Sequence, residues 1–350
     1  MNFLFLKPKQ IGDSLILTPT LQAVKQAYPE AKIWVVVRRG CEGILAGCPA
    51  IDHLLTAAPV EARDHTTGQW WRSLQLVSNL RKVRFDAVFE LGDGDRSRWL
   101  ALLCRAKARY SVPLDRPMKG YFRQAFKSIA DFEYKRGHRV EKDYRTVSTF
   151  LPLPEEIPPL VFNREATRVW PETAAWEDFA LMHITSRQGF NRWTREGWIK
   201  VGQYLLTRYK NLLISTGPAH EETVEAKAVA EALGPACLPT LGRTNWAELA
   251  ELLYRARLFV GIDTAARHLA AACQCPTVAL FGPSIERHWH PWKSPHRIVT
   301  VPGYHAPQNG ELEDEFRMIK ARRMNEIRAE SVIEACSTVS QWGHKGESEK

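Results

Sequence analysis

The chain lacks the long hydrophobic runs that insertion into a membrane requires. No apolar run in its 350 residues approaches the roughly 20 residues of a spanning helix. At the N-terminus only four apolar residues, 3–6, precede Lys7, which is too few for the hydrophobic region of a secretory signal. We therefore expect a cytoplasmic protein.

Cysteines are few and form no recognisable pattern. The seven are scattered and odd in number, and Cys273 and Cys275 are the only close pair, with no second pair at metal-ligand spacing. A disulfide framework and a structural metal site are therefore not expected. Two glycine motifs are missing as well. The lack of G-x-G-x-x-G argues against an NAD-dependent dehydrogenase, and the lack of G-x-S-x-G means that no nucleophile elbow is present.

Acidic residues are scarce in one part of the chain. Residues 96–145 contain fourteen Lys and Arg against five Asp and Glu, an excess equal to the whole chain's net charge of +9. The excess predicts either a solvated face or an anionic partner, namely nucleic acid, a phospholipid surface or a phosphorylated glycolipid. Aromatic residues lie among the cations of residues 118–134, which favours a lipid-headgroup interface over a nucleic-acid surface.

The most informative segment that is present is residues 258–284. Two continuous apolar runs, 258–262 and 277–281, flank an alanine-rich segment with Arg267 and His268. This pattern is typical of a parallel βαβ unit that is buried on both faces. Ligands bind at the carboxyl ends of such strands, so Asp263 and Thr264 are candidate ligand-binding residues. Free amides at the start of the helix would attract an anion.

A similar strand, loop and helix open the chain. The apolar run 3–6 leads into a loop with Gly12 and Asp13, followed by a helix expected over 14–27 with a break at Pro19. Asp13 has two interpretations: a helix N-cap, or a general base at the mouth of a cleft.

Alternation of strands and helices continues through both halves of the chain. The proline-rich stretch 151–160 excludes regular structure there and indicates a domain edge. Strands are expected at 32–37, 86–91, 108–112, 180–185, 211–216, 257–262 and 277–281, and helices at 70–82, 97–105, 195–209, 219–233, 246–254, 265–273 and 326–339.

Further candidate sites lie in loops of the second half. The loop 185–193 combines hydroxyls, an amide and two guanidiniums that could hold a diphosphate, although it could equally be an ordinary polar loop. Glu221 could bind a ribose hydroxyl or serve only as a first-turn helix carboxylate. Asp93 and Asp95, and separately His288 and His290, are too few to specify a metal site.

An ordered set of these segments resembles glycosyltransferase family 9, the ADP-heptose:lipopolysaccharide heptosyltransferases. The resemblance covers most of residues 1–300, and the loop 185–193 is most similar to the branch that adds the third heptose. The segments that carry it are 11–15, 18–19, 98–109, 138–141, 261–265, 268–271, 276–283, 289 and 291–292.

The resemblance implies a GT-B fold, with two Rossmann-like doubly wound α/β domains facing a central cleft. Residues 1–165 would bind the acceptor and 166–325 the nucleotide sugar. A C-terminal helix, 326–342, would pack back on the first domain, and 343–350 would form a disordered tail. The implied reaction is inverting, metal-independent transfer of heptose from ADP-heptose to a lipopolysaccharide inner core, either Kdo-lipid A or a heptosylated core. It would take place at the cytoplasmic face of the inner membrane, with no cofactor and no nucleic-acid partner.

The resemblance also assigns roles to residues. Asp13 matches the general base, and one departure is Asn191, which stands where the family usually has a phosphate-binding lysine. The donor-binding set is Thr185, Ser186, Arg187, Asn191, Arg192, Glu221, Thr244, Asp263, Thr264, Ala265 and His268. The acceptor or membrane set is Lys7, Arg116, Lys119, Arg123 and Lys127. Two alternatives remain: a glycosyltransferase that uses another nucleotide sugar, and a non-catalytic binding protein of lipopolysaccharide assembly.

Overall fold

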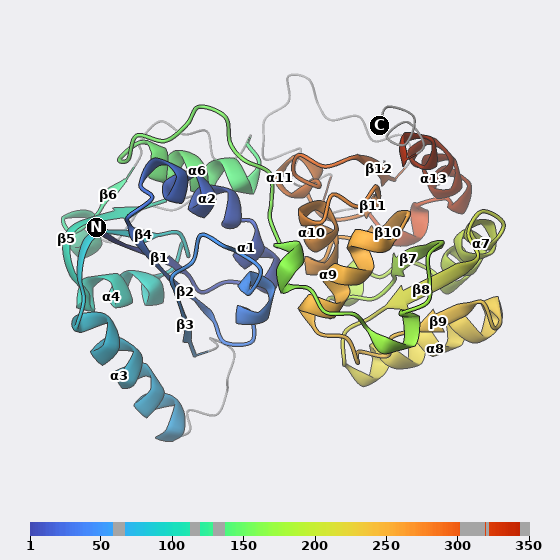
Figure 1. Cartoon of the computed structure of the whole chain (residues 1–350), viewed down its shortest axis with the longest axis horizontal. Coiled ribbons are helices and arrows are strands. Elements are labelled where there is room, and N and C mark those ends of the chain that lie inside the picture. The colour runs from blue at the N-terminus through green and yellow to red at the C-terminus, as the bar shows by residue number, and fades with distance from the viewer. Residues whose placement is uncertain (59–66, 113–119, 129–136, 302–318, 320–321, 344–350) are drawn as a thin grey trace. The chain divides into compact units, whose positions relative to one another are not determined.

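The computed structural model describes residues 1–58, 67–112, 120–128, 137–301, 319 and 322–343. The chain divides into two compact units, Met1–Asn163 and Arg164–Lys350, close to the boundary expected from the proline-rich stretch. Figure 1 shows the elements of both units. The expected tail, apart from Gly343, lies outside the described residues.

The first unit is a parallel sheet between two layers of helices. Its strands follow the order β3-β2-β1-β4-β5-β6. Helices α2 and α6 lie on one face of the sheet, and α3 and α4 lie on the other (Figure 1). The strands are β1 (Asn2–Lys7), β2 (Lys32–Arg38), β3 (His53–Ala57), β4 (Arg84–Glu90), β5 (Arg105–Ser111) and β6 (Lys127–Ser128), and the helices are α1 (Ile11–Leu15), α2 (Thr18–Ala27), α3 (Thr67–Arg81), α4 (Asp95–Leu103), α5 (Gly120–Arg123) and α6 (Arg139–Ser148).

The second unit repeats this plan, with the order β12-β11-β10-β7-β8-β9. Helices α7, α8 and α13 cover one face, and α9 and α10 cover the other (Figure 1). The strands are β7 (Phe179–His183), β8 (Asn211–Ser215), β9 (Cys237–Pro239), β10 (Leu258–Ile262), β11 (Thr277–Phe281) and β12 (His296–Thr300), and the helices are α7 (Arg195–Leu206), α8 (His220–Leu233), α9 (Trp246–Arg255), α10 (Ala265–Ala272), α11 (Glu286–Trp289) and α13 (Ala329–Gly343).

Both sheets therefore have the doubly wound order 3-2-1-4-5-6 when each unit's strands are counted in sequence. The prediction of two Rossmann-like α/β domains is confirmed. In this topology the chain changes direction between the first and fourth strands, and ligands bind outside the carboxyl ends of that strand pair. The switch points are β1/β4 in the first unit and β7/β10 in the second.

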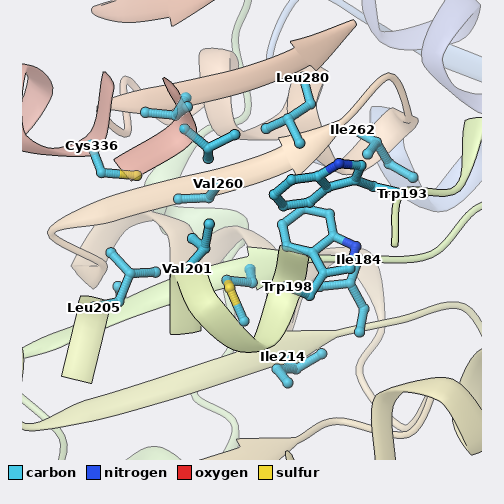
Figure 2. Close-up of a cluster of buried hydrophobic side chains, with 14 of the residues drawn as sticks. Ile184, Trp193, Trp198, Val201, Leu205, Ile214, Val260, Ile262, Leu280 and Cys336 are labelled. Carbon is cyan, nitrogen blue, oxygen red and sulfur yellow. The ribbon is translucent and has the colours of Figure 1, made fainter. Parts of the chain in front are cut away.

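The core of the second unit shows where the last helix belongs. Val332, Cys336 and Val339 of α13 are buried with Trp198 of α7 and with the side chains of β10 and β11 (Figure 2). The apolar stripe of α13 covers the second sheet. The expected packing of residues 326–342 against the first domain stays a prediction.

The break expected near Pro19 is present at the start of the chain. The segment forms two helices, α1 and α2, with Pro19 in the first turn of α2. Proline is tolerated there because a first-turn residue has no intrahelical acceptor to bond. The N-cap of α1 is Gln10, so Asp13 is not a capping residue.

All seven cysteines are buried free thiols. A search of the described helices found none that could span a bilayer.

Candidate functional site

The switch point of the second unit gathers most of the predicted donor-binding residues. Thr185 and Ser186 follow β7, while Asp263 and Thr264 follow β10, the neighbouring strand. Glu221 lies in the first turn of α8, which follows β8 on the other side of β7. The sheet thus brings three loops, far apart in sequence, to one edge.

Two of the predicted donor-binding residues at this edge have buried hydroxyls without a described partner. The Oγ1 atoms of Thr185 and Thr264 form no hydrogen bond within the described part of the chain. Thr264 is the N-cap of α10, but its side chain makes no capping bond. A buried unsatisfied hydroxyl costs on the order of 1–3 kcal/mol, so such groups point to a ligand or to water. Together with the first amides of α10, which starts at Ala265, they suit a negatively charged group.

A fully buried arginine supports Asp263. The guanidinium of Arg267 donates one hydrogen bond to Asp263 Oδ1 and another to the backbone oxygen of Trp289. It also lies 4.6 Å from the ring centre of Phe281. Burial lowers the pKa of Arg267 below its usual range, and the Asp263 carboxylate opposes that shift. The pair offsets the charge of Asp263 and fixes the carboxylate at the end of β10.

Sequence reasoning noted Arg267 but did not place it in the site. The signal was present, because an acid and an arginine four residues apart face each other on one turn of a helix. His268 is buried on the same helix, and its Nε2 is 3.3 Å from Arg267 Nη2.

Arg192 connects the loop after β7 to the start of α8. Its Nε donates to the backbone oxygen of Ser186 at 2.8 Å, and its Nη1 lies 3.3 Å from Glu221 Oε2. Asn191 is buried, with its amide 3.5 Å from Gln188 Oε1. Arg187 is exposed. Arg192 thus connects two of the predicted site residues, Ser186 and Glu221.

A buried tryptophan holds this loop in place. The Nε1 of Trp193 donates to the backbone oxygen of Ile327 at 3.1 Å, and its ring packs edge-on against Trp198 at 5.0 Å (Figure 2). The loop 185–193 is therefore held against the core of the second unit.

The position of Thr244 is set by a close backbone approach. Gly242 has φ +70°, and a Cβ added to it would lie 2.4 Å from Pro218 Cα, so only glycine fits. This contact brings the loop before α9 against the loop before α8. Thr244 is half-buried there, directly before Asn245, whose side chain caps α9.

A histidine that sequence reasoning missed ends β7. His183 Nδ1 is hydrogen-bonded to Ser215 Oγ at 2.9 Å, and burial lowers the pKa of His183 to about 4. The imidazole is therefore neutral at neutral pH. A histidine at a strand end carries no distinctive pattern, so only the fold identifies it.

His183 predicts a pH-dependent stability. The folded-state pKa of His183 lies below the unfolded value of about 6.5. The neutral side chain therefore contributes fully to the free energy of unfolding above pH 6.5, and this contribution is lost as the pH falls towards 4. Between pH 7 and pH 4.5 the wild-type free energy of unfolding should fall by about 2 kcal/mol more than that of His183→Gln. Denaturant unfolding followed by circular dichroism measures this difference. Equal losses in the two proteins would contradict it.

In the first unit, Asp13 stands out because its carboxylate pairs with none of the residues that the structure describes. It lies in α1, directly after β1 at the switch point, and is half-buried. Nothing in the described ranges hydrogen-bonds or ion-pairs with its side chain. The loop before it is fixed, because Arg38 Nη2 donates to Gln10 Oε1 at 2.8 Å. A carboxylate without a described partner, on a fixed loop, is available to accept a proton.

The neighbouring acids are all paired. Arg98 lies within 4 Å of Glu90, Asp93 and Asp95, and Lys142 Nζ lies 3.3 Å from Asp93 Oδ2. Burial lowers the pKa of Lys142 to about 8, and Asp93 opposes that shift. The Asp93 and Asp95 carboxylates are thus engaged by cations, and no group of three metal-ligating side chains occurs among the described residues.

The predicted acceptor set divides in three. Arg123 and Lys127 are exposed, on α5 and β6. Arg116 and Lys119 lie outside the described residues. The prediction that Lys7 contacts the acceptor or the membrane is corrected by its burial. Its Nζ lies 2.5 Å from Asp143 Oδ2, and the two side chains are 5% and 1% exposed. Lys7 is the last residue of β1, a central strand, and its side chain lies in the interior of the protein. It therefore cannot serve as a surface contact.

Comparison with known proteins gives a consistent result. The family model described as glycosyltransferase family 9 (heptosyltransferase) matches residues 73–318. The chain is 27% identical over 299 residues to lipopolysaccharide heptosyltransferase 3 of Escherichia coli strain K12, covering 80% of this chain and 82% of that protein. It is also 27% identical over 299 residues to lipopolysaccharide heptosyltransferase 1 of Pseudomonas aeruginosa, covering 81% of this chain and 79% of that protein.

Solved structures agree on the fold. The E. coli heptosyltransferase WaaC with ADP superimposes with a TM-score of 0.78 at 20% identity, covering 97% of this chain and all of that chain. The E. coli ADP-heptose lipopolysaccharide heptosyltransferase II gives a TM-score of 0.75 at 16% identity, covering 98% of this chain and all of that one. The expected GT-B fold class is confirmed.

Proposed function

The chain belongs to glycosyltransferase family 9, the heptosyltransferases, and from this we propose that it transfers heptose from ADP-heptose to the inner core of lipopolysaccharide. Two of its relatives, both from E. coli, are named lipopolysaccharide heptosyltransferase 3. Their names support an acceptor that already carries heptose. The solved relatives with ADP and with an ADP-heptose analogue support the donor.

The observation that carries the proposal is the group of donor residues at the β7/β10 switch point. The buried hydroxyls of Thr185 and Thr264 and the first amides of α10, at Ala265, would bind the diphosphate. Arg192 would supply the positive charge that Asn191 cannot. Ser186, Arg187 and His268 would complete the phosphate contacts.

Asp263 would bind hydroxyls of the heptose rather than phosphate, because two anions in contact would repel each other. Its pairing with Arg267 fixes the direction of the carboxylate. Glu221, exposed in the first turn of α8, would bind the ribose hydroxyls, and Thr244 would line the adenine pocket.

Asp13 would act as the general base. It would take the proton of the acceptor hydroxyl as the hydroxyl oxygen attacks C1 of the heptose from the side opposite ADP. A single displacement of this kind inverts the anomeric centre. ADP leaves with increased negative charge, which the α10 amides, the Thr264 hydroxyl and Arg192 would stabilise. Because these groups supply the positive potential, the proposed mechanism uses no metal and no cofactor.

The acceptor is attached to a membrane, so we propose that the protein works at the cytoplasmic face of the inner membrane. Arg123 and Lys127, exposed on the first unit, would meet phosphates of the acceptor lipid. Arg116 and Lys119 are proposed for the same role.

A donor-consumption assay tests the proposed function. Purified protein is incubated with ADP-heptose and a panel of truncated lipopolysaccharide cores, and the products are identified by mass. We expect one heptose to be added to a core that already carries heptose, and we expect ADP to inhibit far more strongly than UDP or GDP. Inhibition mainly by UDP or GDP would indicate another donor. ADP-heptose binding without any product would indicate a binding protein.

A further inference from the structure

One helical layer of the first unit has an unusual outer surface. Helices α3, α4 and α5 cover one face of the first sheet, and their inner side chains, such as Leu76, Ala101 and Phe122, form its core. Trp99 and Tyr121 lie on the outer side of this core, with their rings against Phe122.

Large hydrophobic side chains gather on this outer surface. Nine such residues are exposed in the described part of the chain, and five of them belong to these three helices. Their exposed fractions are 68% for Trp71, 41% for Leu74, 51% for Trp99, 44% for Leu103 and 50% for Tyr121. Exposed aromatic residues that cluster in this way mark a binding surface rather than random scatter.

The exposed residues lie next to one another on neighbouring helices. Trp99 and Leu103 are four residues apart on α4 and so share one helix face. The ring of Trp99 stacks on that of Tyr121 from α5, with ring centres 5.6 Å apart. Helix α3, which carries Trp71 and Leu74, contacts α4, and Figure 1 shows the two helices on the same face of the sheet.

The charge of this layer is mainly positive. Asp95, the first residue of α4, is the one acid within the three helices, and it pairs with Arg98. Exposed cations accompany the aromatic residues on every helix of the layer: Arg72 on α3, Arg96 on α4, and Arg123 on α5, followed by Lys127. A second copy of this chain would bring cations against cations, so this surface does not suit self-association.

We propose that the outer face of α3, α4 and α5 docks on an anionic phospholipid bilayer, with Trp99, Leu103 and Tyr121 entering the headgroup region. Tryptophan and tyrosine favour that region because their rings are apolar with one polar end. Arginine and lysine near an anionic surface each add favourable electrostatic energy. The aromatic residues and the excess of cations together therefore select a lipid surface as the partner.

This docking also deepens the proposed function, on which its biological meaning rests. Helix α4 begins where β4 ends, at the edge of the first sheet that also carries Asp13. A bilayer against the outer layer would lie next to the edge at which a membrane-attached acceptor must meet its base.

Vesicle flotation with the purified full chain tests the proposal. The patch variant is Trp99→Gln/Leu103→Gln, and the matched control is Val169→Gln/Val224→Gln, which changes two exposed apolar residues of the second unit with similar exposure, 54% and 50%. Vesicles of phosphatidylglycerol and phosphatidylethanolamine should bind the wild type and the control equally. The patch variant should bind them at least roughly tenfold more weakly. Vesicles of phosphatidylcholine alone, or high salt, should weaken wild-type binding.

Two further measurements separate this proposal from the proposed function. Turnover of a soluble truncated acceptor should be the same in all three proteins, and the far-ultraviolet circular dichroism should show equal folding. Vesicle binding without any heptose transfer would support the docking proposal and overturn only the proposed function. Wild-type binding by the patch variant, no wild-type binding to anionic vesicles, or a wild-type dimer that the patch variant loses would overturn the docking face.

Discussion

Replacing Asp13 by Asn should lower turnover about 100- to 10,000-fold, which is the usual contribution of a positioned general base. Asparagine keeps the shape of the side chain but cannot accept the proton of the acceptor hydroxyl. Because Asp13 pairs with no described residue, its loss leaves no other group unsatisfied, so folding should not change. ADP affinity should stay within about twofold, since the proposed nucleotide contacts belong to the second unit.

Steady-state kinetics with ADP-heptose and a truncated core measure the effect, and isothermal titration with ADP measures binding. Glu30→Gln is the matched control, because it removes one carboxylate from an exposed position of the same unit. It should retain wild-type turnover. If Asp13→Asn keeps more than half of that turnover, the assignment of the base is wrong.

Replacing Lys7 by Met should lower the free energy of unfolding by about 3–5 kcal/mol. The Lys7 and Asp143 side chains are almost completely buried, and their charged atoms are 2.5 Å apart. Removing the lysine leaves a buried carboxylate without its counter-ion, and the cost of that exceeds the value of the pair itself. The double variant Lys7→Met/Asp143→Leu should recover most of the loss.

The chain offers a control with the same distance but different burial. Lys107 Nζ lies 2.5 Å from Asp86 Oδ1, yet these side chains are 58% and 28% exposed. Lys107→Met should therefore cost less than about 1 kcal/mol, since water screens the pair. Urea unfolding of the four proteins gives the comparison. Equal losses for Lys7→Met and Lys107→Met would show that burial is not what gives the Lys7 pair its importance.

The two units have the same fold without recognisable similarity between their sequences. No repeat links the halves of the chain, yet both sheets have the same strand order. Each half alternates apolar runs with helices, and right-handed crossovers then allow few arrangements. A switch point, and with it a ligand-binding edge, follows in each half.

Sequence reasoning found the central strands but missed the edges. Strands β1, β7, β10 and β11 were predicted because they are buried on both faces and read as continuous apolar runs. Strands β3 and β12 lie at sheet edges with mostly half-exposed residues, so no such run marks them. The very short β6 and β9 were missed for the same reason.

The sequence by itself determined the fold class and indicated the loops that are proposed to carry chemistry. Both depend on local patterns: apolar runs buried by a parallel sheet, and polar residues directly after them. Tertiary structure alone decided which of those residues are available. It paired Lys7 with Asp143, 136 positions away, and so removed Lys7 from the surface. It used α13 to cover the second sheet, and it placed Trp99 beside Tyr121. Such contacts join residues distant in the chain, and their energies depend on burial, which the sequence does not record.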